Sequence, residues 1–282
     1  MTASAPRSQT VRSPDGTAIA YRRLGDGPAV IVVGGALRCA DDYLALAEAL
    51  ARRGLTAVVI DRRGRGASGP QGDAYTVGDE VQDVLAVARA ESSSVLFGHS
   101  YGGLIALEAA RGSDRFATVV AYEPGVSIGN SIATDWLGAY RDRLAAGDRR
   151  GAFAAMVTGG GHSPLSRLPG WYARLILRAV IRRRRWKRLE PLLETNLAEH
   201  EQLAVLDDGS ADRYRAVSAQ VLLLGGSKSP PSLTSDLFAA LQATIPNCSG
   251  EVIDGLDHFG PDEGAPELIA ERIHGAISPT GP

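Results

Sequence analysis

The apolar residues in the first part of the chain fall into short continuous runs, and the stretches between these runs repeat their apolar residues at helical spacing. Continuous runs predict strands buried on both faces of a mainly parallel sheet, and the helical spacing predicts helices that each pack one side on that sheet. The predicted strands cover residues 29–33, 55–60, 95–97 and 116–122. This alternation predicts an α/β fold with helices on both faces of a central sheet.

The pattern is different at the start and in the middle of the chain. The turn-forming residues 14–16, Pro-Asp-Gly, lie between two short strand-like stretches, which predicts an antiparallel hairpin before the parallel strands. From about residue 126 to residue 215 there are amphipathic helical stretches without a clear strand, and strands resume afterwards. We therefore predict a core formed by residues 1–125 and 216–282, and a helical lid insertion formed by residues 126–215.

The composition is typical of a soluble globular protein. The chain has 282 residues, 44% of them hydrophobic, and a net charge of -2, so no overall basic field attracts nucleic acid or membrane. The N-terminus lacks the apolar segment of a signal peptide, and Cys39 and Cys248 have neither disulfide nor metal-ligand spacing. We expect a cytoplasmic protein with two buried thiols that acts on a small-molecule substrate, without nucleic-acid or membrane partners.

Two clusters of basic residues invite a functional interpretation. Residues 61–69, Asp-Arg-Arg-Gly-Arg-Gly-Ala-Ser-Gly, lack the Lys-Ser/Thr ending of a phosphate-binding loop, and their glycines suit a structural turn. Residues 182–188 include six basic side chains, but acidic residues elsewhere in the chain balance them. We interpret this second run as a solvated helix face, with docking to an anionic partner or carrier protein as the alternative.

One short motif in the chain indicates nucleophilic chemistry. Residues 98–102, Gly-His-Ser-Tyr-Gly, match the pattern Gly-x-Ser-x-Gly between an apolar strand and an Ala-rich helical stretch. In that context the pattern indicates a sharp strand-to-helix turn that exposes the Ser100 hydroxyl, and the glycines relieve crowding around it. The N-terminus of the following helix favours negative charge that develops nearby. Ser100 is therefore the candidate nucleophile.

A serine hydroxyl is a weak nucleophile at neutral pH, so Ser100 needs a base, and the base needs an acid that orients it. The chain has five histidines. Four lie beside the serine, in the Gly-rich part of the predicted lid or in helical stretches: His99, His162, His200 and His274. His258 remains, in a glycine-containing loop after the last predicted strand, and it is the candidate base.

These features resemble the α/β-hydrolase fold family over nearly the whole chain. The matching elements are the strand that ends in Gly34-Gly35, the turn at residues 61–69, the motif at residues 98–102, a helical cap, and Asp257-His258 near the C-terminus. The resemblance implies a catalytic order of serine, acid and histidine, in which Ser100 and His258 match two of the roles. It also implies that neither a metal nor an organic cofactor is required.

The position of the acid departs from the commonest pattern of the family. Most members carry an aspartate just after the strand predicted at residues 219–225, where this chain has Ser229. Some members place the acid after the strand that follows the helix of the serine motif, and Glu123 lies there. We favour Glu123 as the acid, with Asp236 and Asp257 as the alternatives.

The resemblance also implies which groups bind the negative oxygen of the reaction intermediate. In the family these are two backbone N–H groups, and the corresponding residues are Tyr101, after the nucleophile, and Ala36 or Leu37, in the loop after the early strand. Large apolar side chains are candidates for a substrate pocket, although those in the lid are also suited to its packing core. They are Leu37 and, in the lid, Trp136, Tyr140, Met156 and Trp171.

We therefore expect a serine hydrolase that cleaves a small, fairly apolar carboxylic ester, lactone or thioester through an acyl-enzyme on Ser100. A serine nucleophile argues against the haloalkane-dehalogenase and epoxide-hydrolase branches, which form an ester through a carboxylate. The alternative is a non-hydrolytic use of the same fold, as a cofactor-free cyclase or lyase or as a ligand-binding protein. The absence of an aspartate after Lys228 motivates this alternative.

Overall fold

The computed structural model describes residues 6–160, 165, 168 and 170–277, and the chain divides into two compact units. The core unit contains the chain up to Val126 and again from Ala211, and the helical unit is Ser127–Ser210. The helical unit is thus inserted in the sequence between two strands of the core unit. Among the described residues, no helix combines the length and the apolar character that crossing a bilayer requires.

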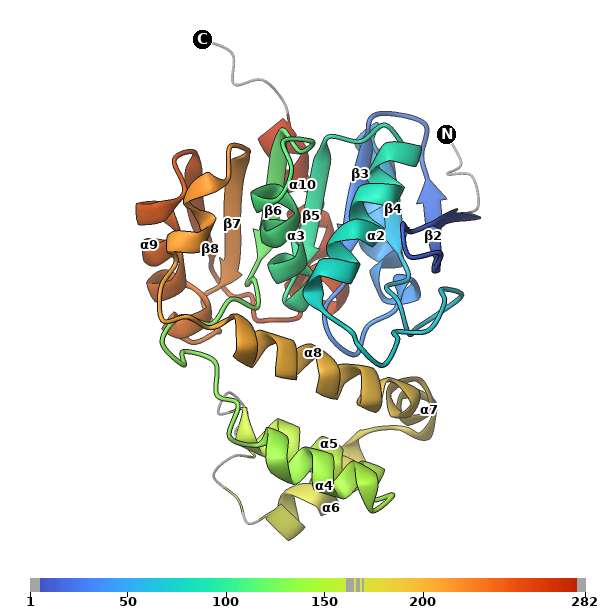
Figure 1. The fold of residues 1–282 in the computed structure, drawn as a ribbon, viewed down its shortest axis with the longest axis vertical. Coiled ribbons are helices and arrows are strands. Elements are labelled where there is room, and N and C mark those ends of the chain that lie inside the picture. Colours follow the sequence, from blue (N-terminus) through green and yellow to red (C-terminus); the bar gives the residue numbers. More distant parts are fainter. Residues whose placement is uncertain (1–5, 161–164, 166–167, 169, 278–282) are drawn as a thin grey trace. The chain divides into compact units, whose positions relative to one another are not determined.

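The core unit is built on an eight-stranded sheet in the order β1-β2-β4-β3-β5-β6-β7-β8 (Figure 1). The strands β1 and β2 form an antiparallel hairpin, β2 also pairs antiparallel with β4, and every other pair is parallel. The strands are β1 (Arg7–Arg12), β2 (Ala18–Leu24), β3 (Ala29–Val33), β4 (Thr56–Ile60), β5 (Val95–His99), β6 (Thr118–Tyr122), β7 (Gln220–Gly226) and β8 (Cys248–Ile253). This arrangement confirms the predicted hairpin and the predicted α/β fold class.

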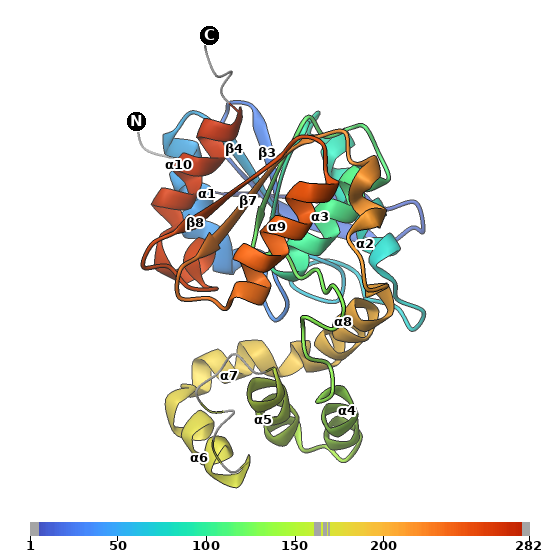
Figure 2. The same ribbon diagram turned by 90° about the vertical axis from the view of Figure 1, so that its left-hand side faces the viewer.

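Helices cover both faces of this sheet. Figures 1 and 2 show α1 and α10 together on one face, and α2, α3 and α9 on the other. The α-helices of the core unit are α1 (Leu44–Arg52), α2 (Val77–Ala90), α3 (Tyr101–Arg111), α9 (Ser235–Thr244) and α10 (Pro266–Ile277). Shorter helical turns are η1 (Ala40–Tyr43), η4 (Asp212–Ala216), η5 (Pro231–Leu233) and η6 (Gly260–Gly264). Apolar side chains of α1 and α10, such as Leu50 and Ile273, are fully buried between these helices and the sheet.

The helical unit has no strand among its described residues. Its helices are α4 (Leu137–Ala145), α5 (Arg149–Gly159), α6 (Gly170–Val180), α7 (Arg183–Leu189), η3 (Glu190–Leu192) and α8 (Leu193–Leu206). Tyr140 on α4 is fully buried, and its hydroxyl donates to the Leu193 carbonyl and accepts from the Asn196 amide. These bonds tie α4 to α8 in the interior of the unit.

The two cysteines correct a sequence expectation. Neither forms a disulfide and both are half-buried, whereas the sequence analysis predicted buried thiols. Cys39 lies in the loop before η1, and Cys248 begins β8, the edge strand of the sheet. Loop and edge positions leave one side of a residue without packing partners, which explains the partial exposure.

The central strand β5 and the helix α3 lie so close together that only glycine fits between them. A methyl group added to Gly98 would lie 2.3 Å from the Gly102 carbonyl oxygen, and one added to Gly102 would lie 2.2 Å from the Val33 carbonyl oxygen. Both obstacles are backbone atoms, which cannot move aside without shifting a strand or a helix. The two outer glycines of the Gly-x-Ser-x-Gly pattern are therefore required by packing in this fold.

We expect Gly98→Ala to lower the free energy of unfolding by at least about 2 kcal/mol, because the new methyl group overpacks backbone in the middle of the sheet. Gly112→Ala is the matched control, since a methyl group at this end of α3 would meet the Glu108 carbonyl oxygen at 3.5 Å. Urea denaturation of both variants provides the measurement. Equal stability of the two variants would show that the β5–α3 contact is not tight.

Candidate active site

Ser100 occupies the turn between β5 and α3 in an unusual backbone conformation. Its φ is 56° and its ψ is -120°, a combination that side-chain-bearing residues rarely adopt. The Ser100 N–H donates to the Tyr122 carbonyl, and its own carbonyl accepts from the amides of Gly103, Leu104 and Gly125. These bonds hold the strained turn in place, so that the serine side chain is fixed at the carboxyl edge of the parallel strands.

Hydrogen bonds join Ser100, His258 and Glu123 in one line. The Ser100 Oγ lies 3.0 Å from His258 Nε2, and His258 Nδ1 lies 2.6 Å from Glu123 Oε2. Because a carboxylate oxygen accepts, Nδ1 carries the proton and Nε2 is left to accept from the serine hydroxyl. The second Glu123 oxygen accepts from the Gly226 amide at 2.8 Å. Glu123 is completely buried, so both of its oxygens have partners where water is excluded.

The two alternative acids, Asp257 and Asp236, have hydrogen-bond partners other than His258. Asp257 is exposed, and its carboxylate accepts from the Phe259 amide two residues further on. Asp236, at the start of α9, has the hydroxyl of its neighbour Ser235 within 3.4 Å. Among the described carboxylates, the one within hydrogen-bond distance of the His258 ring is therefore Glu123.

His99 forms a second, buried set of hydrogen bonds that the sequence analysis did not anticipate. Its Nε2 lies 2.7 Å from the His258 carbonyl oxygen, and its Nδ1 lies 2.7 Å from the Tyr43 hydroxyl. A carbonyl accepts, so Nε2 donates, and Nδ1 of the neutral ring accepts from Tyr43. The Tyr43 hydroxyl in turn accepts from the Gly35 amide at 2.9 Å. Burial lowers the pKa of His99 well below its ordinary value of 6.5, which keeps the ring neutral.

The loop that carries His258 is thus fixed through its backbone. His99 binds the carbonyl of His258, and the Tyr122 hydroxyl donates to the carbonyl of Asp257 at 2.7 Å. A signal for these bonds exists in the sequence, because His99 is a polar residue that ends a continuous apolar strand. A buried polar side chain at such a position needs a partner, although the pattern does not say which one.

Three arginines of the turn at residues 61–69 bind the loop after β3 or helix α2. Arg62 and Arg65 donate to the Gly35 carbonyl, and Arg62 also donates to the Gly34 carbonyl. Arg62 forms a buried pair with Glu80 at 2.6 Å, and Arg63 pairs with a carboxylate on α2. The three guanidinium groups therefore bind backbone carbonyls and carboxylates of the protein itself, as expected for a structural turn.

The candidate oxyanion groups lie on the elements that flank Ser100. Tyr101 is the first residue of α3, whose amides point toward the helix N-terminus. A methyl group on Gly35 would lie 3.1 Å from the Ser100 Cβ, so the loop that carries Ala36 and Leu37 passes directly beside the serine. Leu37 has a positive φ of 58°, a local strain of the kind that functional loops carry.

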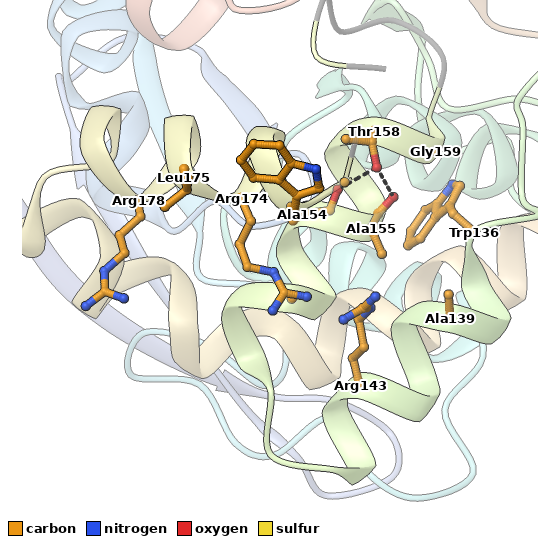
Figure 3. Close-up of a pocket in the computed structure, with 13 residues that line it drawn as sticks. Trp136, Ala139, Arg143, Ala154, Ala155, Thr158, Gly159, Arg174, Leu175 and Arg178 are labelled. Carbon is orange, nitrogen blue, oxygen red and sulfur yellow. Dashed lines mark hydrogen bonds between the residues drawn. The ribbon is translucent and has the colours of Figure 1, made fainter. Parts of the chain in front are cut away.

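Of the apolar residues predicted for the substrate pocket, one belongs to the core unit and four belong to the helical unit. Leu37 belongs to the core unit, Tyr140 is buried in the helical unit, and the Met156 sulfur lies 3.2 Å from the Asn196 amide nitrogen. Trp136 and Trp171 line a cavity of about 770 Å³ within the helical unit (Figure 3). This cavity is lined by residues of the helical unit, and none of Ser100, His258 and Glu123 contributes to it.

Of the remaining histidines, the structure describes His200 and His274. His200 on α8 is half-buried and bonds the Asn196 carbonyl, and His274 on α10 is exposed. His162 lies outside the described residues.

A known family and several solved structures are similar to the chain over most of its length. The model of the family described as "Alpha/beta hydrolase family" matches residues 29–272. An alpha/beta hydrolase from Sphaerobacter thermophilus is similar at 29% identity and a TM-score of 0.79, over 96% of this chain and 100% of that chain.

Two more distant structures share the fold. An epoxide hydrolase from Vigna radiata is 17% identical, with a TM-score of 0.68 over 96% of this chain and 97% of that one. An esterase from Exiguobacterium antarcticum is 16% identical, with a TM-score of 0.67 over 94% of this chain and 98% of that one.

The low pKa of His99 predicts how stability depends on pH. In the unfolded chain this imidazole takes up a proton near pH 6.5, whereas in the folded protein it stays neutral. The unfolded state therefore binds more protons below pH 6.5, so the stability contributed by neutral His99 is present above that pH and is lost as the pH falls.

We expect His99→Gln to reduce the slope of unfolding free energy against pH below 6.5, by up to about 1.4 kcal/mol per pH unit. Urea denaturation at a series of pH values measures the slope. His274→Gln, which removes an exposed imidazole, is the matched control. An identical slope in the wild type and in His99→Gln would contradict the buried neutral state.

Proposed function

The chain belongs to the alpha/beta hydrolase family, and from this premise we propose that it is a serine hydrolase that cleaves a carboxylic ester, lactone or thioester through an acyl-enzyme on Ser100. The observation that carries the proposal is the line of hydrogen bonds from Ser100 Oγ through His258 to Glu123. In this arrangement the nucleophile, the base and the orienting acid are within hydrogen-bond distance of one another before any substrate binds.

The reaction follows from the direction of these bonds. His258 Nε2 takes the proton of the Ser100 hydroxyl while the oxygen attacks the substrate carbonyl, and the imidazolium then protonates the leaving group. The buried Glu123 carboxylate stabilises the imidazolium and holds its Nδ1 proton in place. A water molecule that His258 activates in the same way releases the acyl group and restores the serine.

Backbone amides stabilise the negative oxygen of the tetrahedral intermediate. We assign this role to the N–H of Tyr101 and to that of Ala36 or Leu37. Arg62 supports the assignment because it binds the carbonyls of Gly34 and Gly35 and thereby holds the peptide planes of this loop. One such donor contributes roughly 3 kcal/mol to the transition state.

The side chains near Ser100 in the core unit favour an apolar substrate. Phe259 is 43% exposed, and its ring packs edge-on against the His258 ring at 5.8 Å. Leu37 is half-buried in the loop beside the serine. These two side chains present apolar surface to the acyl or alcohol part of a substrate, which agrees with small, fairly apolar esters.

Other chemistries on this fold receive less support. Epoxide hydrolases occur among the structural neighbours, but an ester formed through a carboxylate nucleophile needs an aspartate where this chain has Ser100. The non-hydrolytic alternative was motivated by the missing aspartate after Lys228. Because Glu123 lies at hydrogen-bond distance from His258, that motive no longer applies.

We expect the wild-type protein to hydrolyse p-nitrophenyl esters of short acids and to react covalently with a fluorophosphonate probe at Ser100. Ser100→Ala should lose the labelling and lower kcat by about 10⁶-fold, because the nucleophile is removed. Mass spectrometry of the labelled peptide and the release of p-nitrophenol are the measurements. A Ser100→Ala variant that keeps full turnover would refute the proposal.

We expect Glu123→Gln to lower kcat by about 10³- to 10⁴-fold with an intact fold, because an amide cannot stabilise the imidazolium as a carboxylate does. Asp257→Asn and Asp236→Asn are the matched controls and should stay within about tenfold of the wild type, since neither carboxylate bonds His258. Steady-state kinetics on the same ester measures the three variants. A larger loss in a control than in Glu123→Gln would move the acid to that residue.

A further inference from the structure

Arg38 joins the loop after β3 to the loop after β8. Residues 34–39, called the oxyanion loop below, include the candidate backbone donors and end at η1. The Arg38 side chain is 10% exposed, and its Nε lies 2.5 Å from Asp262 Oδ2, while its Nη2 donates to Glu263 Oε1 at 3.0 Å. Both carboxylates belong to η6, the helical turn that begins two residues after His258. The ion pairs therefore connect the oxyanion loop with the loop that carries the candidate base.

The turn η6 is bonded in its own right to the backbone beside His258. The amides of Glu263 and Gly264 both donate to the Phe259 carbonyl. The Arg38 guanidinium also lies over the Phe259 ring, 5.2 Å from its centroid. That ring packs edge-on against the His258 ring at 5.8 Å. Arg38 therefore contacts η6 through charge and the neighbour of the candidate base through a cation–π interaction.

The pair between Arg38 and Asp262 is costly to bury. The Asp262 side chain is 1% exposed, and burial raises the pKa of its carboxyl above the usual range, although Arg38 opposes this effect. A buried ion pair contributes little net stability compared with apolar side chains of similar volume, because both charges lose their hydration. A movement that separates the two groups would leave a buried charge without a partner, which is strongly unfavourable. The pair therefore favours one position of the oxyanion loop relative to η6.

The oxyanion loop contains a strained residue next to Arg38. Leu37 has a φ of 58°, and a strained backbone of this kind persists only where the surroundings enforce it. Arg65 donates to the Arg38 carbonyl at 3.2 Å, so Arg38 is held at its backbone by Arg65 and at its side chain by Asp262. An N–H group stabilises an oxyanion only when it points at the place where the charge develops. The hold on Arg38 therefore bears on the direction of the donors that precede it.

We propose that Arg38 and Asp262 are positioning residues, whose ion pair sets the distance between the backbone donors of the oxyanion loop and His258. The inference rests on the proposed hydrolase function, because these donors have a role only in a reaction that forms an oxyanion. Neither side chain touches the reacting atoms, so the pair acts through the backbone of the two loops.

The test compares Arg38→Gln, Asp262→Asn and the double variant in the hydrolysis of a p-nitrophenyl ester. A misplacement of about 1 Å in an active site costs roughly 100-fold in rate, so we expect each single variant to lower kcat about 10- to 100-fold. KM should change by less than about threefold, because the donors act in the transition state. The double variant should fall no more than about threefold below the weaker single variant, since the two residues act as a unit.

A trifluoromethyl ketone reports on the oxyanion donors directly, because Ser100 adds to its carbonyl carbon and the carbonyl oxygen becomes the oxyanion. We expect its inhibition constant to rise in Arg38→Gln and Asp262→Asn in proportion to the fall in kcat/KM. Titration with a fluorophosphonate gives the concentration of active sites, so a loss of folded protein is not mistaken for a loss of rate. The double variant leaves neither charge buried alone, so it tests the inference even where a single variant does not fold.

Arg53→Gln is the control variant, since it breaks a 2.7 Å ion pair with Glu267 of α10, outside both loops, and should keep kcat within about twofold of the wild type. The inference alone is overturned if the wild type hydrolyses the ester and the Arg38 and Asp262 variants behave as Arg53→Gln does. It is also overturned if kcat falls while the inhibition constant stays unchanged, because the donors would then be in place. A wild type that neither hydrolyses the ester nor reacts with the fluorophosphonate refutes the proposed function, and this inference with it.

Discussion

The candidate active site depends on the tight contact between β5 and α3, at which Ser100 is held with a positive φ. A strained conformation of this kind costs about 1–3 kcal/mol and persists only where the surroundings enforce it. Here three backbone amides bind the Ser100 carbonyl, and glycines allow the backbone of α3 to pack directly against the backbone of the sheet. The same contact that strains the serine therefore fixes the point from which its hydroxyl projects.

Buried polar groups connect the turn at Ser100 to the loops that follow the other strands. His99 and Tyr43 link the Gly35 amide to the His258 carbonyl, and Glu123 links the His258 ring to the Gly226 amide. Each of these groups is costly to bury without a partner, so the bonds favour one arrangement of the loops. Four loops that lie far apart in the sequence are thereby held together by buried hydrogen bonds.

The sequence indicated most of the fold through its local patterns. Continuous apolar runs marked the central strands, and the polar turn before β2 marked the hairpin. Ser100 and His258 could be selected because a short motif and the shortage of histidines leave few choices. Glu123 could be selected only through family resemblance, because a glutamate at a strand end has no pattern that distinguishes an orienting acid from a surface residue.

What the sequence determined by itself was therefore the succession of strands and helices along the chain and the identity of the candidate reactive groups, since both depend on residue type and spacing. Only the tertiary structure decided which groups meet. The bond from Glu123 to His258 spans 135 residues, and the bond from His99 to the same loop spans 159. It also decided that Trp171 and Leu175 on α6 are exposed whereas Ala173 is buried, because periodicity defines the sides of a helix but not which of them is buried.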